Sequence, residues 1–101
     1  MTIKITYEWA IEYRDEHGDI EEIDHFNITK DAVTAFAANK GPADLVLVCD
    51  TWETIQENLE DRQWAYVEDG KLPKTFSGSA KVPQRFHKQL AATKENNGEP
   101  S

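Results

Sequence analysis

Four side chains in this sequence could bind a transition metal, namely His17, His25, His87 and Cys49. No two of them have the CxxC or HxxxH spacing that brings local ligands to one ion. The acidic loop 15–19 is rich in carboxylates, but it lacks the alternating ligands and distant Glu of an EF-hand. We therefore expect no metal site and no cofactor.

Acid–base catalysis would need two titratable groups that face each other. Asp24 and His25 are neighbours in the sequence, but adjacent strand residues point to opposite faces. The sequence also lacks a serine nucleophile motif, a Cys–His arrangement and a phosphate-binding glycine loop. We expect a non-enzymatic protein. A small enzyme or ligand binder is a weaker alternative, which would require a pocket with converging polar groups.

Charge is distributed unevenly along the chain. Residues 1–70 hold seventeen of the nineteen acidic residues and five of the eleven basic ones, and the whole chain has a formal net charge of −8. Such a body would be repelled by duplex DNA, so we expect no direct duplex binding. It favours a basic protein partner instead. The alternative is that the acidity serves only solubility.

The acidic residues most suited to binding a partner lie in and around the first predicted hairpin. Glu8 and Glu12 share one face of a strand, because strand side chains alternate. Carboxylates at strand spacing can imitate a nucleic-acid backbone and enter a groove that binds DNA or RNA. The predicted partner-binding residues are Glu8, Glu12, Asp15, Glu16, Asp19, Glu21, Glu22 and Asp24.

A basic segment follows the acidic body and suggests an alternative. Residues 71–94 carry six Lys or Arg residues around Phe76 and Phe86. Basic residues interleaved with aromatic ones can bind single-stranded nucleic acid by charge and stacking. The favoured interpretation is that Phe86 packs inward as part of a helix core.

The first half of the chain predicts a hairpin, a helix and a strand. Residues 3–13 alternate between apolar and polar, which is typical of a half-buried strand. Residues 20–26 alternate imperfectly, which predicts a returning strand with a bulge near Glu21 and Glu22. Thr29 is the expected N-cap of a helix over 30–40, with Val33, Phe36 and Ala37 as its apolar stripe. The apolar run within 43–53 predicts a central strand covered on both faces.

The second half predicts a strand at 63–68, a turn at Asp69–Gly70 and a helix over 83–94. We interpret residues 54–62 as a long connection with one helical turn and 73–81 as an exposed loop. The predicted fold is α+β: a two-layer sandwich in the order ββαββα, with an antiparallel four-stranded sheet and both helices on one face. Residues 1–94 form one domain, and residues 95–101 form a disordered tail.

The longest apolar run, residues 45–49, is far shorter than the roughly 20 residues that span a bilayer. We therefore expect no membrane association. The N-terminal residues show no signal-peptide pattern, and a single cysteine cannot form an internal disulfide. These features predict a cytoplasmic protein.

Two segments carry a resemblance to known proteins. Arg62–Pro73 and Lys81–His87 resemble segments of small uncharacterised proteins of phages and prophages. The size, acidity and ββαββ pattern are also similar to several phage-encoded inhibitors, including anti-CRISPR proteins. The resemblance implies an interaction protein that blocks a host nucleic-acid-binding machine, and it assigns no individual binding residue.

These observations predict an acidic protein-binding module of phage type that docks on a basic surface of a host protein. The main alternative is a structural or regulatory module that self-associates, for example as a homodimer. Self-association would use a sheet edge or an exposed tryptophan, because Trp9, Trp52 and Trp64 are hard to enclose together in so small a core.

Overall fold

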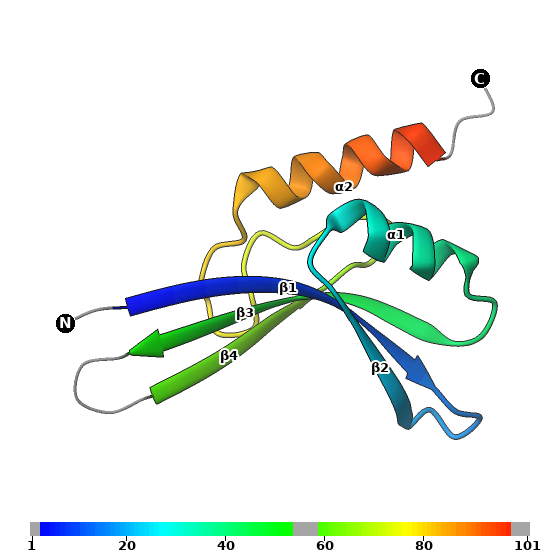
Figure 1. Ribbon diagram of the computed structural model, residues 1–101, viewed down its shortest axis with the longest axis horizontal. Helices are drawn as coiled ribbons and strands as arrows, with labels where there is room; N and C mark the ends of the chain where they lie inside the picture. The colour runs from blue at the N-terminus through cyan, green and yellow to red at the C-terminus, as the bar shows by residue number, and fades with distance from the viewer. Residues whose placement is uncertain (1–2, 54–58, 98–101) are drawn as a thin grey trace.

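The computed structural model describes residues 3–53 and 59–97. The strands are β1 (Ile3–Arg14), β2 (Ile20–Phe26), β3 (Ala43–Glu53) and β4 (Leu59–Tyr66), and the helices are α1 (Thr29–Ala38) and α2 (Gln84–Asn97). The strands form one antiparallel sheet in the order β2-β1-β3-β4. Both helices lie on the same side of this sheet (Figure 1). The predicted α+β fold, with its order ββαββα, is confirmed.

The first hairpin contains the predicted bulge. Tyr13 pairs with Glu22 and Arg14 pairs with Ile20, so Glu21 is the extra residue in β2. An extra residue shifts the alternation of a strand by one position. Ile20 and Ile23 therefore lie on the same face of the sheet, although three positions separate them.

The main core lies between the sheet and the helices. Trp9 and Ile11 of β1 are buried there with Leu45, Leu47 and Cys49 of β3. The predicted central position of β3 is confirmed, since it pairs with both β1 and β4. Successive residues of β3 point to opposite faces of the sheet. Even Val46, on the face opposite the helices, is only 1% exposed.

The start of α1 differs from the prediction. The N-cap position is held by Ile28 without a side-chain hydrogen bond, and Thr29 is the first helical residue. The Thr29 hydroxyl is instead buried between the layers, where it accepts a hydrogen bond from Trp9 Nε1 at 2.8 Å and donates to Gln89 Oε1 at 2.6 Å. The helix buries Ala32, whereas Ala37 of the predicted stripe is exposed.

The region between β3 and β4 also differs. Residues 59–62 belong to β4, so the predicted connection over 54–62 is wrong for these four positions. Its other residues, 54–58, lie outside the described part of the chain. The prediction rested on the charged content of this segment, but charged side chains are also tolerated on a strand at the edge of a sheet, where β4 lies.

The predicted turn at Asp69–Gly70 is confirmed. Both residues have positive φ, 55° and 74°, and the flanking Glu68 and Lys71 exchange two backbone hydrogen bonds. Two consecutive positive φ values characterise a type I′ turn, which favours Asp-Gly.

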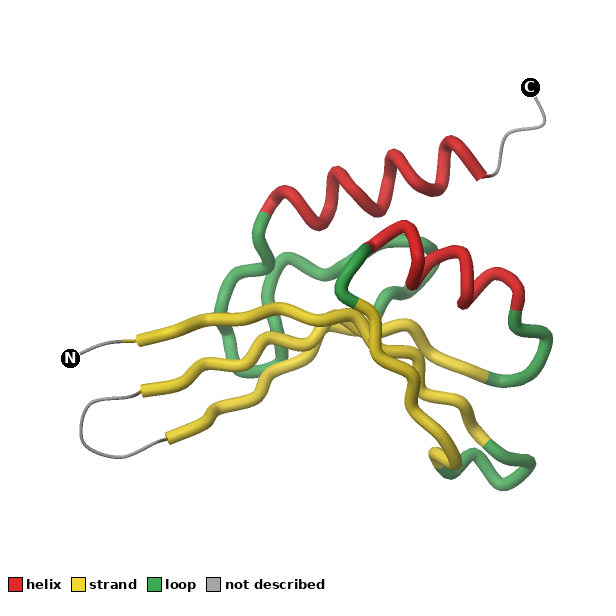
Figure 2. Tube along the Cα trace, viewed as in Figure 1, coloured by secondary structure: helices red, strands yellow, loops and turns green. Residues whose placement is uncertain are grey.

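Residues 72–82 form a loop that fills the space between the sheet and α2 (Figure 2). The prediction of an exposed loop holds for Ser77, Gly78 and Ser79, but Leu72, Phe76 and Val82 are part of the core. These side chains are buried because α2 is separated from the strands and something apolar must fill the gap.

Helix α2 packs on α1 and reaches the sheet through aromatic side chains. The Phe86 ring meets Trp9 edge-on at 6.2 Å and Tyr7 at 5.2 Å. The helix continues to Asn97, three residues beyond the predicted end, and the rest of the predicted disordered tail, 98–101, lies outside the described residues. Within the described residues, no helix is both long and apolar enough to cross a membrane.

Candidate functional site

The face of the sheet opposite the helices, here called the helix-free face, carries a groove. Its floor and walls come from all four strands, because residues that pair across neighbouring strands share a face. The groove encloses about 250 Å³. Its lining residues are Ala10, Glu12, Ile23, His25, Val46, Val48, Arg62, Trp64 and Tyr66.

The groove has an apolar floor and exposed apolar walls. Ala10 and Val46 are almost fully buried in the floor, whereas Ile23 on β2 and Trp64 on β4 are each 43% exposed. The walls stand on the two edge strands, so the twisted sheet presents them to solvent on either side of the floor. Exposed apolar side chains beside a hollow often mark a contact surface.

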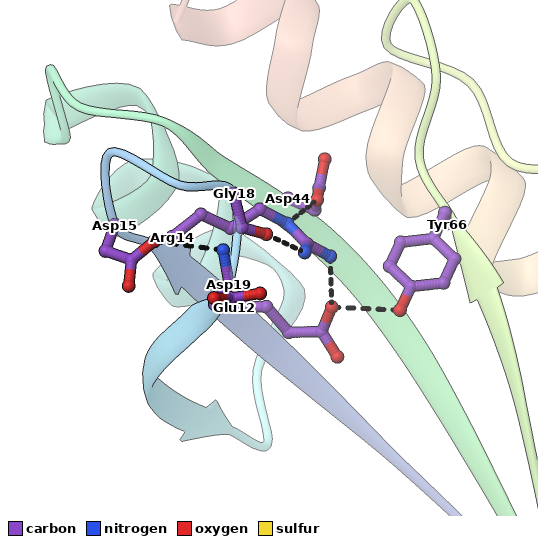
Figure 3. A network of polar contacts seen from close by, with 7 residues as sticks. All are labelled: Glu12, Arg14, Asp15, Gly18, Asp19, Asp44 and Tyr66. Carbon is purple, nitrogen blue, oxygen red and sulfur yellow. Dashed lines mark hydrogen bonds and ion pairs between the residues drawn. The ribbon is translucent and has the colours of Figure 1, made fainter.

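Tyr66 links the two sides of the helix-free face. Its hydroxyl donates a hydrogen bond to Glu12 Oε1 at 2.9 Å, so the side chain reaches from β4 across β3 to β1 (Figure 3). Its ring therefore covers part of the floor, which helps to explain why its cross-strand partner Val46 is buried. Burial raises the pKa of the Tyr66 phenol, and the hydrogen bond to Glu12 raises this pKa further.

Arg14 is the centre of a polar network at one end of the groove (Figure 3). Its Nε donates to Asp44 Oδ2 at 2.8 Å, its Nη1 donates to the Gly18 carbonyl at 2.9 Å, and its Nη2 lies 3.5 Å from Glu12 Oε1. The hydrogen bond to Asp44 is the main cause that raises the pKa of the Arg14 guanidinium. The network joins β1 to β3 and to the loop of the first hairpin.

Two more ion pairs lie on the helix-free face. His25 Nδ1 lies 2.9 Å from Glu8 Oε2, and Arg62 Nε donates to Asp50 Oδ1 at 2.7 Å. Among the described residues of this face, the four ion pairs join four carboxylates to two guanidiniums and one imidazole. With the imidazole neutral, these groups carry a net charge of −2.

The acidic hairpin, defined as residues 15–24, adjoins the groove. It contains six carboxylates and no Lys or Arg. Two of these carboxylates have internal roles: Asp15 Oδ1 accepts hydrogen bonds from the backbone of His17 and Asp19, and Asp24 accepts one from the Tyr13 hydroxyl at 3.0 Å. Burial is the main cause that raises the pKa of this phenol, and the bond to Asp24 adds to it.

The other acidic side chains of the hairpin are exposed. Glu16 and Asp19 lie in the turn, Glu21 is the bulged residue, and Glu22 is opposite Tyr13. The bulge and these charges lie along β2, an edge strand. Charge and irregularity on an edge strand oppose the addition of another strand.

The eight predicted partner-binding residues therefore do not form one surface. Glu8 and Glu12 share the helix-free face as predicted, but both are held in ion pairs with groups of the same chain. Asp15, Glu16 and Asp19 lie in the turn between β1 and β2, and Glu21, Glu22 and Asp24 lie along β2. The structure separates a charge-paired sheet face from an uncompensated hairpin.

Sequence reasoning missed the aromatic wall of the groove. It began the last strand at Gln63 and did not assign Trp64 and Tyr66 to a face. The alternation of Arg62, Trp64 and Tyr66 could have shown that the three share a face. Which face they share depends on how β4 pairs with β3, which the local pattern does not contain.

The basic segment does not offer its aromatic rings to a ligand. Phe76 and Phe86 are both buried in the core, so neither has a free face on which a base could stack. Arg85 instead lies over the rings of Tyr7 and Phe86, at 5.2 and 4.7 Å from their centroids. In the part of the chain that the structure describes, no three His, Cys, Asp or Glu side chains gather as a metal site would require.

Comparison of the chain with models of protein families, with curated proteins and with solved structures found no match in any of the three. The resemblance to small phage proteins stays a prediction.

Proposed function

We propose that this protein is a non-enzymatic protein-binding module that docks on a basic surface of another protein. The observation that carries the proposal is the continuity of two surfaces. The acidic hairpin has six carboxylates and no Lys or Arg, and its strand β2 supplies Ile23 and His25 to the neighbouring groove.

The two surfaces would serve different steps of binding. Uncompensated charge on the hairpin accelerates the encounter with a basic partner and orients it. The groove then supplies apolar area, and a few aromatic anchors usually dominate the affinity of an interface. Trp64 and Ile23 are the side chains placed to act in this second step.

The partner we propose is a nucleic-acid-binding protein of a bacterial host, as for the phage inhibitors that the sequence resembles. Such proteins present Lys and Arg along the groove that holds phosphates. A carboxylate-rich hairpin is complementary to that groove. We place this action in the cytoplasm, where a single buried thiol such as Cys49 stays reduced.

The test is capture from a host lysate on the immobilised protein at about 0.1 M and about 1 M salt. The higher salt concentration screens attraction between the charges of the two surfaces much more strongly. The captured partner is then purified, and its affinity is measured for two double variants. Glu21→Lys with Glu22→Lys reverses the charge at two of the six acidic positions of the hairpin. Asp61→Lys with Glu68→Lys makes the same change of net charge at exposed positions elsewhere.

We expect capture at low salt only, and at least a tenfold loss of affinity for the hairpin variant against a much smaller loss for the control. Equal losses would show that net charge alone matters and would contradict the proposed surface. Absence of specific capture at either salt concentration would also overturn the proposal. Reversal of Glu8 and Glu12 would be a poorer test, because it breaks internal ion pairs.

Self-association through the same groove is the second candidate. Its support is the 43% exposure of both Trp64 and Ile23 on a face that no described element covers. Two copies of a chain with net charge −8 repel each other, so this association should strengthen with salt. Docking on a basic partner should weaken with salt. Sedimentation velocity at low and high salt therefore separates the two candidates.

A further inference from the structure

The geometry points to the groove of the helix-free face as a receptor for one arginine side chain of the partner. The inference rests on the proposed function and names the group that the groove would bind. The methylene stem would lie on Val46 and Val48 beside the Trp64 indole, and the guanidinium would bind Glu12.

The shape of the groove suits a long side chain better than a flat surface. Its floor is apolar, its walls are Ile23 and Trp64, and one end is closed by Glu12 and Tyr66. Arginine buries its stem against apolar surface while its charged end makes polar contacts. The apolar floor thus suits the methylene stem of arginine, and the polar end of the groove suits its guanidinium.

Glu12 has one acceptor to offer. Its Oε1 accepts a hydrogen bond from the Tyr66 hydroxyl and lies 3.5 Å from Arg14 Nη2. Its Oε2 accepts no hydrogen bond from any described residue. No buried side-chain polar atom lacks a partner in the described part of the chain, so Oε2 is not fully buried. The carboxylate is only 15% exposed as a side chain, which fixes its position before a ligand arrives.

The charge around the groove favours a cation. The groups in the ion pairs described for the helix-free face carry a net charge of −2 when His25 is neutral. Arg62 is positive and also lines the groove, but Asp50 holds its guanidinium through two contacts, at 2.7 and 3.4 Å. Its charge is therefore largely compensated. Arg62 also lies at the end of the groove opposite to Glu12.

Arginine fits this groove better than lysine. A planar guanidinium can donate one hydrogen bond to Glu12 Oε2 and can also lie against an aromatic ring. Tyr66 places such a ring directly beside the Glu12 carboxylate. A lysine ammonium would satisfy the charge, but it has no planar group that could lie flat against the ring.

The experiment is an NMR titration with a short capped Gly/Ser peptide that carries one central arginine. We expect saturable shifts of the Trp64 indole N–H and of the amides of Val46 and Val48. The same peptide with citrulline has the same shape without the charge and should bind at least tenfold more weakly. A lysine peptide should lie between the two.

Two variants test the residues. Glu12→Gln keeps an acceptor for the Tyr66 hydroxyl and should weaken the arginine peptide about tenfold. Glu21→Gln is the matched control, since it removes the same charge from an exposed position outside the groove, and it should leave the affinity nearly unchanged. Trp64→Ala removes a wall that is 43% exposed and lies outside the core under the helices, so the fold should survive while the binding weakens.

Equal affinities for arginine and citrulline, equal effects of the two Gln variants, or shifts confined to residues 15–19 would each overturn the inference. If the groove variants also leave capture of the basic partner unchanged while the hairpin variant abolishes it, the proposed function stands without the arginine receptor. If no partner is captured, the proposed function fails, whatever the peptide shows.

Discussion

The two faces of the sheet solve different physical problems. The face under the helices is closed by apolar packing: Ile11 and Leu47 are fully buried, and Thr29 accepts the hydrogen bond of the Trp9 indole N–H. The helix-free face is instead organised by ion pairs and by Tyr66, with apolar side chains left in contact with water. A buried face stabilises the fold, and a paired but open face remains available for binding.

The difference also explains where the acidic residues are tolerated. On the helix-free face each of Glu8, Glu12, Asp44 and Asp50 has a cation or an imidazole beside it. The hairpin concentrates like charges without such partners, and it can do so because it extends beyond the core into solvent (Figure 1). Repulsion among exposed charges is screened by water and salt.

The largest expected contrast comes from one substitution made on both faces. Ile11→Ala removes a fully buried side chain between the sheet and the helices and should lower the free energy of unfolding by about 3 kcal/mol. Ile23→Ala, at a 43% exposed position on the helix-free face, should lower it by less than about 1 kcal/mol. Urea denaturation followed by circular dichroism measures both values.

Ile23→Ala should nevertheless weaken binding of the basic partner, whereas a mild Ile11→Val should not. Similar losses of stability from the two alanine variants would mean that the helix-free face is covered in solution, and the comparison between the faces would fail.

A smaller effect is expected at the buried hydroxyl. Thr29→Val keeps the shape of the side chain but leaves the Trp9 indole N–H and the Gln89 carbonyl without this partner. We expect a loss of about 1–2 kcal/mol, the usual cost of an unsatisfied buried polar group. Thr6→Val is the matched control on an exposed position of β1.

The control should change stability very little. The intrinsic fluorescence of Trp9 should report the loss of its hydrogen bond in Thr29→Val alone. Equal stability of the two variants would show that water replaces the hydroxyl and that the three elements are not tied together by it.

The smallest effect concerns alkaline pH. The ordinary pKa of tyrosine is 10.0, and burial raises the pKa of Tyr66 in the folded state. The folded protein then holds this proton more tightly than the unfolded chain, so the associated stability is complete below pH 10 and is lost as pH rises through the folded-state pKa. Burial raises the pKa of Tyr7, under the helices, in the same direction.

Tyr66→Phe should therefore flatten the decline of stability above pH 10. Tyr7→Phe should also flatten this decline, since Tyr7 lies on the face under the helices and burial raises its pKa as well. Denaturation curves between pH 8 and pH 11 give the slopes. Parallel slopes for the wild type and Tyr66→Phe would mean that the phenol is neither buried nor held against Glu12 in solution.

Local pattern was sufficient for most of the elements. Alternation in residues 3–13 identified the first strand, the broken alternation in residues 20–26 identified its bulge, and Asp69–Gly70 identified the turn. These features depend on backbone sterics and side-chain direction within a few residues, which the sequence contains directly.

The candidate site needed the tertiary structure. Tyr66 and Glu12 are 54 positions apart and meet only because β4 pairs with β3 and β3 pairs with β1. Thr29 was predicted to be a helix cap, but its hydroxyl instead forms hydrogen bonds with Trp9 and Gln89. An unsatisfied buried indole N–H costs more free energy than an uncapped helix end that is exposed to water.

The sequence by itself determined the order of the strands and helices, most of their extents, and the concentration of negative charge in the first hairpin. Only the tertiary structure decided that Trp64 and Ile23 stand on the helix-free face and that Glu8 and Glu12 are paired within the chain. The physical reason is range: backbone preferences act over a few residues, whereas burial and ion pairing depend on which distant segments meet.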